Sequence, residues 1–268
     1  MHILQQVPSP CTLRRDLKRI VFGERVRYPR CECGRVKKIK QEERWRCKKC
    51  RHPFSITSCC WLKGTKLPLE TIWLLLWCWQ KQIPVKQACD IIGISYPTTF
   101  NWYSKFRDKI PKERLDTILG GNVVCDEMFT KGNCIMGAKE KGTRNIVMKV
   151  LHEKDPNKRH AIEFLTRFLK THTKLSTDGS GIYKGCDKWH KLKHEYEVHR
   201  RFEFTLTAEI EGLWGVFRTF VRRMYHHVTN YKLEELVCEF CLRFRKDEIF
   251  ENPLSYLNVC LKEKPFAL

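Results

Sequence analysis

Three acidic residues have the types and the placement that metal-dependent chemistry requires. Asp126 lies inside an apolar run, 122–129, that reads as a strand, where a buried carboxylate is costly unless it is paired or binds a cation. Asp178 ends another predicted strand at a glycine-rich turn, and Glu211 lies in a predicted helix. Carboxylates from two strands and a helix can converge on two Mg²⁺ or Mn²⁺ ions, which serve phosphodiester chemistry. The pattern predicts a magnesium site at these three residues.

Neighbouring acids compete for two of these positions. Glu127 is an alternative to Asp126, and Glu209 is an alternative to Glu211. The opposing interpretation is that all of them are surface carboxylates among the thirty acidic residues of the chain. The occurrence of all three in this order of elements favours a shared site.

The predicted helix that carries Glu211 places two further residues on the same face. Trp214 and Arg218 follow Glu211 by three and seven positions, so the three side chains lie along one side of the helix. We expect Arg218 to contact DNA phosphate and Trp214 to pack the helix onto a sheet. His226 and His227 are expected to belong to a basic end of the helix that faces DNA.

Four cysteines between residues 29 and 58 have the spacing C-x-C-G…C-x-x-C, namely Cys31, Cys33, Cys47 and Cys50. Four thiolates suit a tetrahedral Zn²⁺, and Gly34 lets the backbone fold back toward the sulfurs. The segment is too small to fold on its apolar content, so zinc would supply the folding energy. The first pair is one residue shorter than the usual C-x-x-C, and four unrelated cysteines are the alternative. The spacing predicts a structural zinc ribbon.

Residues 85–107 have the pattern of a helix-turn-helix. A short helix, 85–92, is followed by Gly93 as a left-handed turn, Ser95 as an N-cap and a second helix, 96–107. The second helix of such a pair enters the major groove of DNA, although the same pattern occurs in ordinary helical bundles. The residues expected to contact bases are Tyr96, Thr98, Thr99 and Asn101, with Lys105 and Arg107 contacting phosphate.

The composition indicates a polyanionic partner. Fifty-one lysines and arginines against thirty acidic residues give a formal charge of +21, although solubility alone is the alternative explanation. Fifteen cysteines without a secretory signal at the N-terminus predict an intracellular, reducing location. The most apolar run, 72–79, is too short to span a bilayer, so no membrane contact is expected.

Hydrophobic periodicity and turn signals divide the chain into five segments. They are a basic lead-in (1–28), the zinc ribbon (29–58), a helix-turn-helix block (66–118), an α/β block (121–250) that begins at Gly120-Gly121, and a C-terminal tail (251–268). The α/β block has predicted strands at 122–129, 133–139, 145–151, 174–177 and 195–199, and helices at 158–172, 207–223 and 233–245. The expected fold class is α/β, with a mixed sheet flanked by helices.

Several motifs together resemble a known family. They are the cysteine pairs followed by W-R-C-K-K-C-R-H-P-F-S, then C-D-E-M-F at 125–129, I-M-G-A-K-E at 135–140, S-T-D-G-S-G-I-Y at 176–183, I-E-G-L-W at 210–214 and Y-H-H-V at 225–228. On these motifs the chain is similar to the zinc-ribbon insertion-sequence transposases of bacteria and their eukaryotic relatives, the Merlin superfamily. The resemblance spans about residues 29–245.

The resemblance implies a ribonuclease-H-like fold with an Asp-Asp-Glu metal site, whose ligands carry over to Asp126, Asp178 and Glu211. It also implies binding of double-stranded DNA at terminal inverted repeats, strand cleavage and joining to target DNA by a homo-oligomer. The location would be the nucleus of a eukaryote or the cytoplasm and nucleoid of a bacterium. Many relatives have Asn and Lys where this chain has Ala208 and Arg218. A domesticated, non-catalytic DNA-binding regulator and a nuclease of the same fold are therefore the alternatives.

Overall fold

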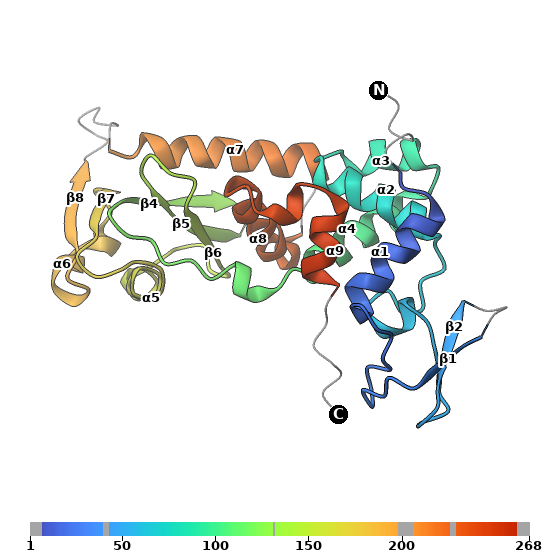
Figure 1. Cartoon of the computed structure of the whole chain (residues 1–268). Coiled ribbons are helices and arrows are strands. Elements are labelled where there is room, and N and C mark those ends of the chain that lie inside the picture. The colour runs from blue at the N-terminus through green and yellow to red at the C-terminus, as the bar shows by residue number, and fades with distance from the viewer. Residues whose placement is uncertain (1–6, 40–42, 131, 198–205, 226–228, 262–268) are drawn as a thin grey trace. The chain divides into compact units, whose positions relative to one another are not determined.

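The computed structural model describes residues 7–39, 43–130, 132–197, 206–225 and 229–261 (Figure 1). The chain forms two compact units. The first consists of Met1–Pro111 with Glu248–Leu268, and the second is Lys112–Asp247. The predicted boundary at Gly120-Gly121 therefore falls inside the second unit.

The first unit combines a small antiparallel sheet with helices. Its strands, in the order β1-β2-β3, are β1 (Val36–Ile39), β2 (Arg44–Cys47) and β3 (Pro53–Phe54). Its helices are α1 (Pro10–Phe22), α2 (Leu69–Gln80), α3 (Val85–Ile92), α4 (Tyr96–Asp108) and α9 (Pro253–Cys260).

The C-terminal segment forms part of this first core, which corrects the prediction of a tail at 251–268. The Tyr256 hydroxyl of α9 donates to the Phe106 carbonyl at 2.8 Å, and the Trp61 indole donates to the Cys260 carbonyl at 2.9 Å. Asn252 caps the helix and Pro253 occupies its first turn, which are ordinary start signals. Burial of the apolar residues of α9 drives the packing of this helix into the core of the first unit.

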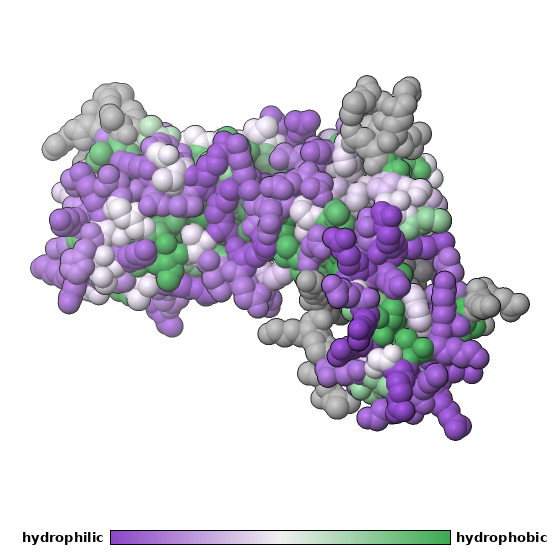
Figure 2. Space-filling model, viewed as in Figure 1, coloured by the Kyte–Doolittle hydropathy of each residue, from purple (hydrophilic) through white to green (hydrophobic). Residues whose placement is uncertain are grey.

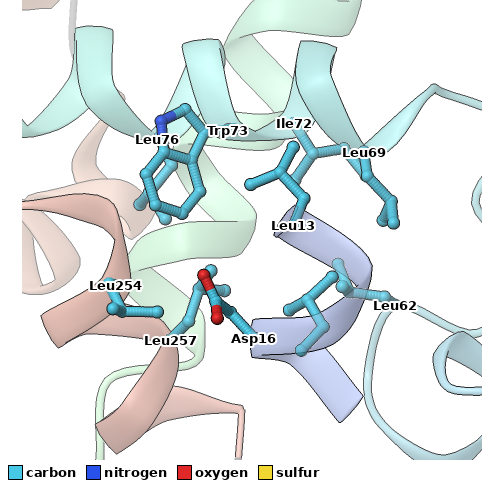
Figure 3. Close-up of a pocket in the computed structure, with 10 residues that line it drawn as sticks. Leu13, Asp16, Leu62, Leu69, Ile72, Trp73, Leu76, Leu254 and Leu257 are labelled. Atoms are coloured by element: carbon cyan, nitrogen blue, oxygen red, sulfur yellow. The ribbon is translucent and has the colours of Figure 1, made fainter. Parts of the chain in front are cut away.

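An apolar pocket lies where α1, α2 and α9 meet (Figure 3). Leu13 of α1 points toward Ile72 and Trp73 of α2, and Leu257 of α9 forms the opposite wall. Asp16 is the charged side chain among the lining residues. The pocket marks the buried side of α1, because the rest of that helix is largely polar.

The two helices predicted at 85–92 and 96–107 are present, with the second one residue longer. Gly93 between them has the left-handed conformation, with φ 74° and ψ 34°, as its position requires. The Ser95 side chain accepts a hydrogen bond from the Thr98 backbone N–H and so caps α4.

The second unit contains a mixed five-stranded sheet flanked by helices, which confirms the predicted α/β architecture. Its strands are β4 (Asn122–Thr130), β5 (Asn133–Glu140), β6 (Ile146–Leu151), β7 (Lys174–Asp178) and β8 (Lys193–Glu197), in the order β6-β5-β4-β7-β8. Strand β4 is antiparallel to β5 and parallel to β7, which is parallel to β8. Its helices are α5 (Lys158–Phe168), α6 (Cys186–Trp189), α7 (Ala208–Tyr225) and α8 (Leu233–Phe244).

The helices α5 and α7 lie on opposite sides of this sheet (Figure 1). Phe164 of α5 belongs to the same buried cluster as Val123 and Cys125 of β4. Helix α5 ends four residues before the predicted 172, because Leu169 is extended and forms a parallel bridge with Leu119. No helix among the described residues is long and apolar enough to cross a membrane.

Candidate functional site

Two of the predicted metal ligands meet because β4 and β7 are parallel neighbours. Val124 pairs with Ser176, and two residues further along each strand, on the same face, lie Asp126 and Asp178. One carboxylate oxygen from each of these aspartates and one from Glu127 all lie within 4.8 Å of one another. The third member of this acidic cluster is thus Glu127, the residue named above as a competitor of Asp126. We use the term acidic cluster for these three residues.

Trp214 of α7 fixes the orientation of Asp126. Its indole Nε1 donates to Asp126 Oδ2 at 2.9 Å. Gly137 pairs with Asp126 across the sheet, and a Cβ atom built on Gly137 would lie 2.4 Å from the indole ring. The ring can therefore cover this part of the sheet only because residue 137 has no side chain. Trp214 packs the helix onto the sheet as predicted, and it also holds a carboxylate.

Glu127 is held from the opposite face of the sheet. The buried Tyr183 hydroxyl donates to the Glu127 carboxylate, and Cys125 Sγ lies 3.4 Å from the same hydroxyl oxygen. Cys125 and Glu127 are two residues apart on β4, so their side chains begin on one face. Glu127 thus reaches the cluster from the buried core side.

Burial of the acidic cluster favours the binding of protons or of a cation, because it destabilises the charged carboxylates. Burial raises the pKa of Glu127 to about 8, an effect that the Tyr183 hydroxyl opposes and the charges of Asp126 and Asp178 reinforce. Burial also raises the pKa of Asp126, while the Trp214 hydrogen bond lowers it. Clustered carboxylates that resist ionisation are stabilised by a divalent cation, so the donor set fits Mg²⁺ or Mn²⁺.

The structure separates the two candidate glutamates of α7. Glu209 forms an ion pair with the buried Lys139 and accepts from the Gly142 N–H at 3.2 Å, and Lys139 lowers the pKa of Glu209. Glu211 accepts from Thr207 Oγ1 at 3.2 Å, and its charge raises the pKa of Asp126. Glu211 is therefore the glutamate whose charge acts on the acidic cluster, although it is not one of the three residues within 4.8 Å.

A further buried carboxylate, Glu197, was not singled out by the sequence patterns. It pairs with Asp178 across β7 and β8, is 7% exposed and accepts from the Leu206 N–H at 2.7 Å. Leu206 immediately precedes Thr207, which bonds Glu211. Glu197 thus ties the segment that enters α7 to the sheet. The available signal was an acidic residue inside a predicted strand, 195–199, as at Asp126.

Three of the four predicted cysteine ligands form one group. One sulfur each from Cys31, Cys47 and Cys50 all lie within 4.8 Å, with Cys31 and Cys47 3.6 Å apart. The Cys50 N–H points at Cys47 Sγ at 3.4 Å. Cys33 lies outside this group, with its sulfur 3.8 Å from the Arg35 carbonyl oxygen. The short spacing of the first pair accounts for this, because a single residue separates the two cysteines.

A hydrogen bond between Cys31 and Cys50 shifts the pKa values of the two thiols in opposite directions. A hydrogen bond with Cys50 is the main cause that lowers the pKa of Cys31, and the same bond raises the pKa of Cys50 to about 11. A zinc ion replaces the thiol protons when thiolates bind it. The three sulfurs fit zinc, and Cys33 is the nearest candidate in sequence for the fourth position.

Two of the residues expected to contact DNA from α4 are buried, which corrects those predictions. Thr99 is 0% exposed and donates to the Ser95 carbonyl at 3.2 Å, so it cannot contact a base. Arg107 is 6% exposed and donates to Ser104 Oγ at 2.9 Å. Both lie on the side of α4 that packs against its own unit.

The other residues predicted to contact DNA differ in their exposure and in the contacts that their side chains already make. Tyr96 is 42% exposed and Asn101 is also exposed, whereas the Thr98 hydroxyl lies 2.8 Å from Ser95 Oγ at the helix start. The Lys105 ammonium lies over the Trp102 ring, 4.9 Å from its centroid. Arg218 is exposed on α7. His226 and His227 lie outside the described residues.

The sequence matches no protein-family model and no curated protein. Among solved structures, the fold is similar to a chain in a structure described as a simian T-cell lymphotropic virus intasome in complex with PP2A regulatory subunit B56 gamma. The TM-score is 0.36 at 10% identity, over 63% of this chain and 67% of that chain. A likeness of this degree establishes neither fold family nor function.

We expect the acidic cluster to make the metal-free protein less stable as the pH rises. The folded-state pKa of Glu127 is about 8, above its ordinary value of 4.5, so the folded state retains a proton that the unfolded state releases. The stabilising contribution is complete below pH 4.5 and is lost between about 4.5 and 8. Glu127→Gln should flatten this part of the profile, measured by denaturant unfolding at pH 5 and pH 8 without added metal. An unchanged pH dependence in the variant would contradict the assignment.

Proposed function

We propose that this chain is a DNA transposase, a metal-dependent enzyme that cleaves and joins DNA strands. The observation that carries the proposal is the acidic cluster, in which Asp126, Glu127 and Asp178 bring three carboxylates within 4.8 Å at neighbouring strands. The charge of Glu211 on α7 raises the pKa of Asp126, which supports Glu211 as the glutamate of the proposed Asp-Asp-Glu site. The sequence resemblance described above agrees with this interpretation.

Each residue of the site has its own role in the proposed reaction. Bound Mg²⁺ or Mn²⁺ would polarise the attacking and leaving oxygens of a phosphodiester. Asp126 and Asp178 would hold the cation, while the Trp214 N–H keeps the Asp126 carboxylate in one orientation. In the proposed reaction, water attacks phosphorus and releases a 3′-hydroxyl, whose oxygen then attacks a phosphorus of target DNA and displaces a second 3′-oxygen. Arg218, exposed one turn beyond Trp214, is suited to contact phosphate.

The first unit would recognise the DNA. The cysteine group fits a zinc ribbon, and the α3-Gly93-α4 pair has the layout of a helix-turn-helix, with Tyr96, Thr98 and Asn101 near the start of α4. A formal charge of +21 supports a nucleic-acid partner. Because two element ends must be cut and joined together, we propose a homo-oligomer as the active form.

The test is cleavage of a duplex that carries the repeats flanking the gene, with and without Mg²⁺ or Mn²⁺. Asp126→Asn should reduce cleavage by at least about 100-fold, because the carboxylate that holds the cation is lost. The asparagine retains an oxygen that accepts from Trp214, so the fold should remain. The matched control is Asp187→Asn, an exposed aspartate outside the cluster, which should cleave as the wild type does.

Two outcomes would contradict this function. Equal cleavage by Asp126→Asn and the wild type would remove the acidic cluster from the mechanism. Binding without metal-dependent cleavage in either protein would favour a DNA-binding regulator, the alternative that Ala208 and Arg218 keep open.

A further inference from the structure

A groove lined by basic side chains runs between α1 and the small sheet of the first unit. Three cations come from α1, Arg14, Arg15 and Lys18, and a fourth, Lys38, comes from β1. Trp45 of β2 also lines the groove. We call this set the α1 groove. The surface of this part of the molecule, at the lower right of Figure 2, is largely hydrophilic.

The folding of α1 explains why its cations face the groove. Leu13, Leu17 and Ile20 are buried, so the helix has one apolar side that packs inward. Arg14 and Lys18 are four residues apart and therefore share another side of the helix, which remains in solvent. The apolar residues of α1 thus fix the direction of its basic residues.

Strand pairing directs the opposite wall in the same way. Lys38 pairs with Trp45 across β1 and β2, so both side chains lie on one face of the hairpin and line the groove. Lys37 pairs with Arg46 and points to the other face, because side chains alternate along a strand. Trp45 packs against Phe22 and Phe54, which holds its ring in place as an apolar floor.

The groove retains a net positive charge after its internal pairs are considered. Arg14 bonds Glu43 at 2.8 Å, and Arg15 lies 3.6 Å from Asp16. Lys18 and Lys38 form no ion pair within the part of the chain that the structure describes. Two cations on facing walls of one groove are therefore available to an anion.

We propose that the α1 groove binds the sugar–phosphate backbone of duplex DNA. Lys18 and Lys38 bind phosphates from the two walls, the indole of Trp45 contacts the sugar edge, and the Thr57 hydroxyl in the groove supplies a neutral donor. The choice of DNA as the anion rests on the proposed function. The groove supplies backbone affinity that α4 lacks, since Arg107 is buried and Lys105 lies over tryptophan rings.

The test compares two charge-reversal variants of equal charge. Lys18→Glu with Lys38→Glu alters the groove, and Arg19→Glu with Lys37→Glu makes the same change on the same elements outside it. Binding of a fluorescent duplex is measured by anisotropy at several salt concentrations, without added divalent metal. The groove variant should bind at least about 10-fold more weakly and lower the salt slope by about 2, one unit for each lost phosphate contact. The control should lose less than about 3-fold.

The other possible results of the binding experiment contradict the proposal. The inference would be overturned if both variants lost the same affinity for the duplex, or if the groove variant lost none. It would also be overturned if the wild type did not bind the duplex, or if it preferred an RNA duplex of the same sequence. Circular dichroism establishes that both variants are folded. A wild type that binds through the groove and never cleaves would overturn the proposed function and leave this inference standing.

Discussion

Replacing Gly137 by alanine is expected to lower metal-dependent cleavage by about 100-fold and the free energy of unfolding by about 1–3 kcal/mol. The added methyl group would lie 2.4 Å from the Trp214 ring, so the indole must move. Its movement breaks the 2.9 Å hydrogen bond to Asp126 and releases that carboxylate. Cleavage assays and denaturant unfolding measure the two effects.

The matched control for this prediction is Gly215→Ala on α7. A Cβ atom at Gly215 meets no atom within 4 Å, and alanine favours a helix, so this variant should be as stable as the wild type or more stable by about 0.5–1 kcal/mol. Trp214→Phe separates the two causes, because it removes the hydrogen bond without adding a methyl group to the sheet. If Gly137→Ala retains full cleavage, Trp214 does not orient Asp126 for the reaction.

Replacing Cys47 by serine is expected to remove bound zinc and to unfold the small sheet of the first unit. Cys47 is fully buried, and its sulfur lies 3.6 Å from Cys31 and accepts the Cys50 N–H. Structural zinc provides about 10–16 kcal/mol of binding free energy in small modules, so its loss cannot be offset by a core this small. Zinc content per chain and the circular dichroism of the purified variants measure the effect.

The controls for zinc use two other cysteines. Cys33→Ser should retain more zinc than Cys47→Ser, because Cys33 lies outside the group of three sulfurs. Cys11→Ser, at an exposed position of α1, should retain all of it. Zinc retained by Cys47→Ser, or absent from the wild type purified without chelator, would refute the site.

The sequence predicted those features that depend on local pattern. The α3 bounds, the Gly93 turn and the Ser95 cap follow from short-range rules of helix start and stop, and the structure has all three. Asp126 was identifiable because an acid within an apolar strand is costly, wherever its partners lie. The mixed sheet followed from strands and helices that alternate along the chain.

Features that depend on tertiary contacts were not predictable in this way. Alternation along β4 directs Glu127 away from Asp126, and its inclusion in the cluster depends on Tyr183, 56 positions later. The distinction between Glu209 and Glu211 depends on Lys139, which lies on a strand far away in sequence. The burial of Thr99 was likewise not predictable from the sequence, since a polar side chain gives no indication that it packs inward.

The helix α9 has a consequence for synthesis of the protein. The core of the first unit includes α9 as well as α1 and α2, so it is completed only after the ribosome has made the whole second unit. A nascent chain or a prematurely terminated product would expose the apolar faces of α1 and α2 that α9 covers. The segment that contains α9 is therefore a condition for the folding of α1 and α2, so a product that stops before α9 would form an aggregation-prone fragment.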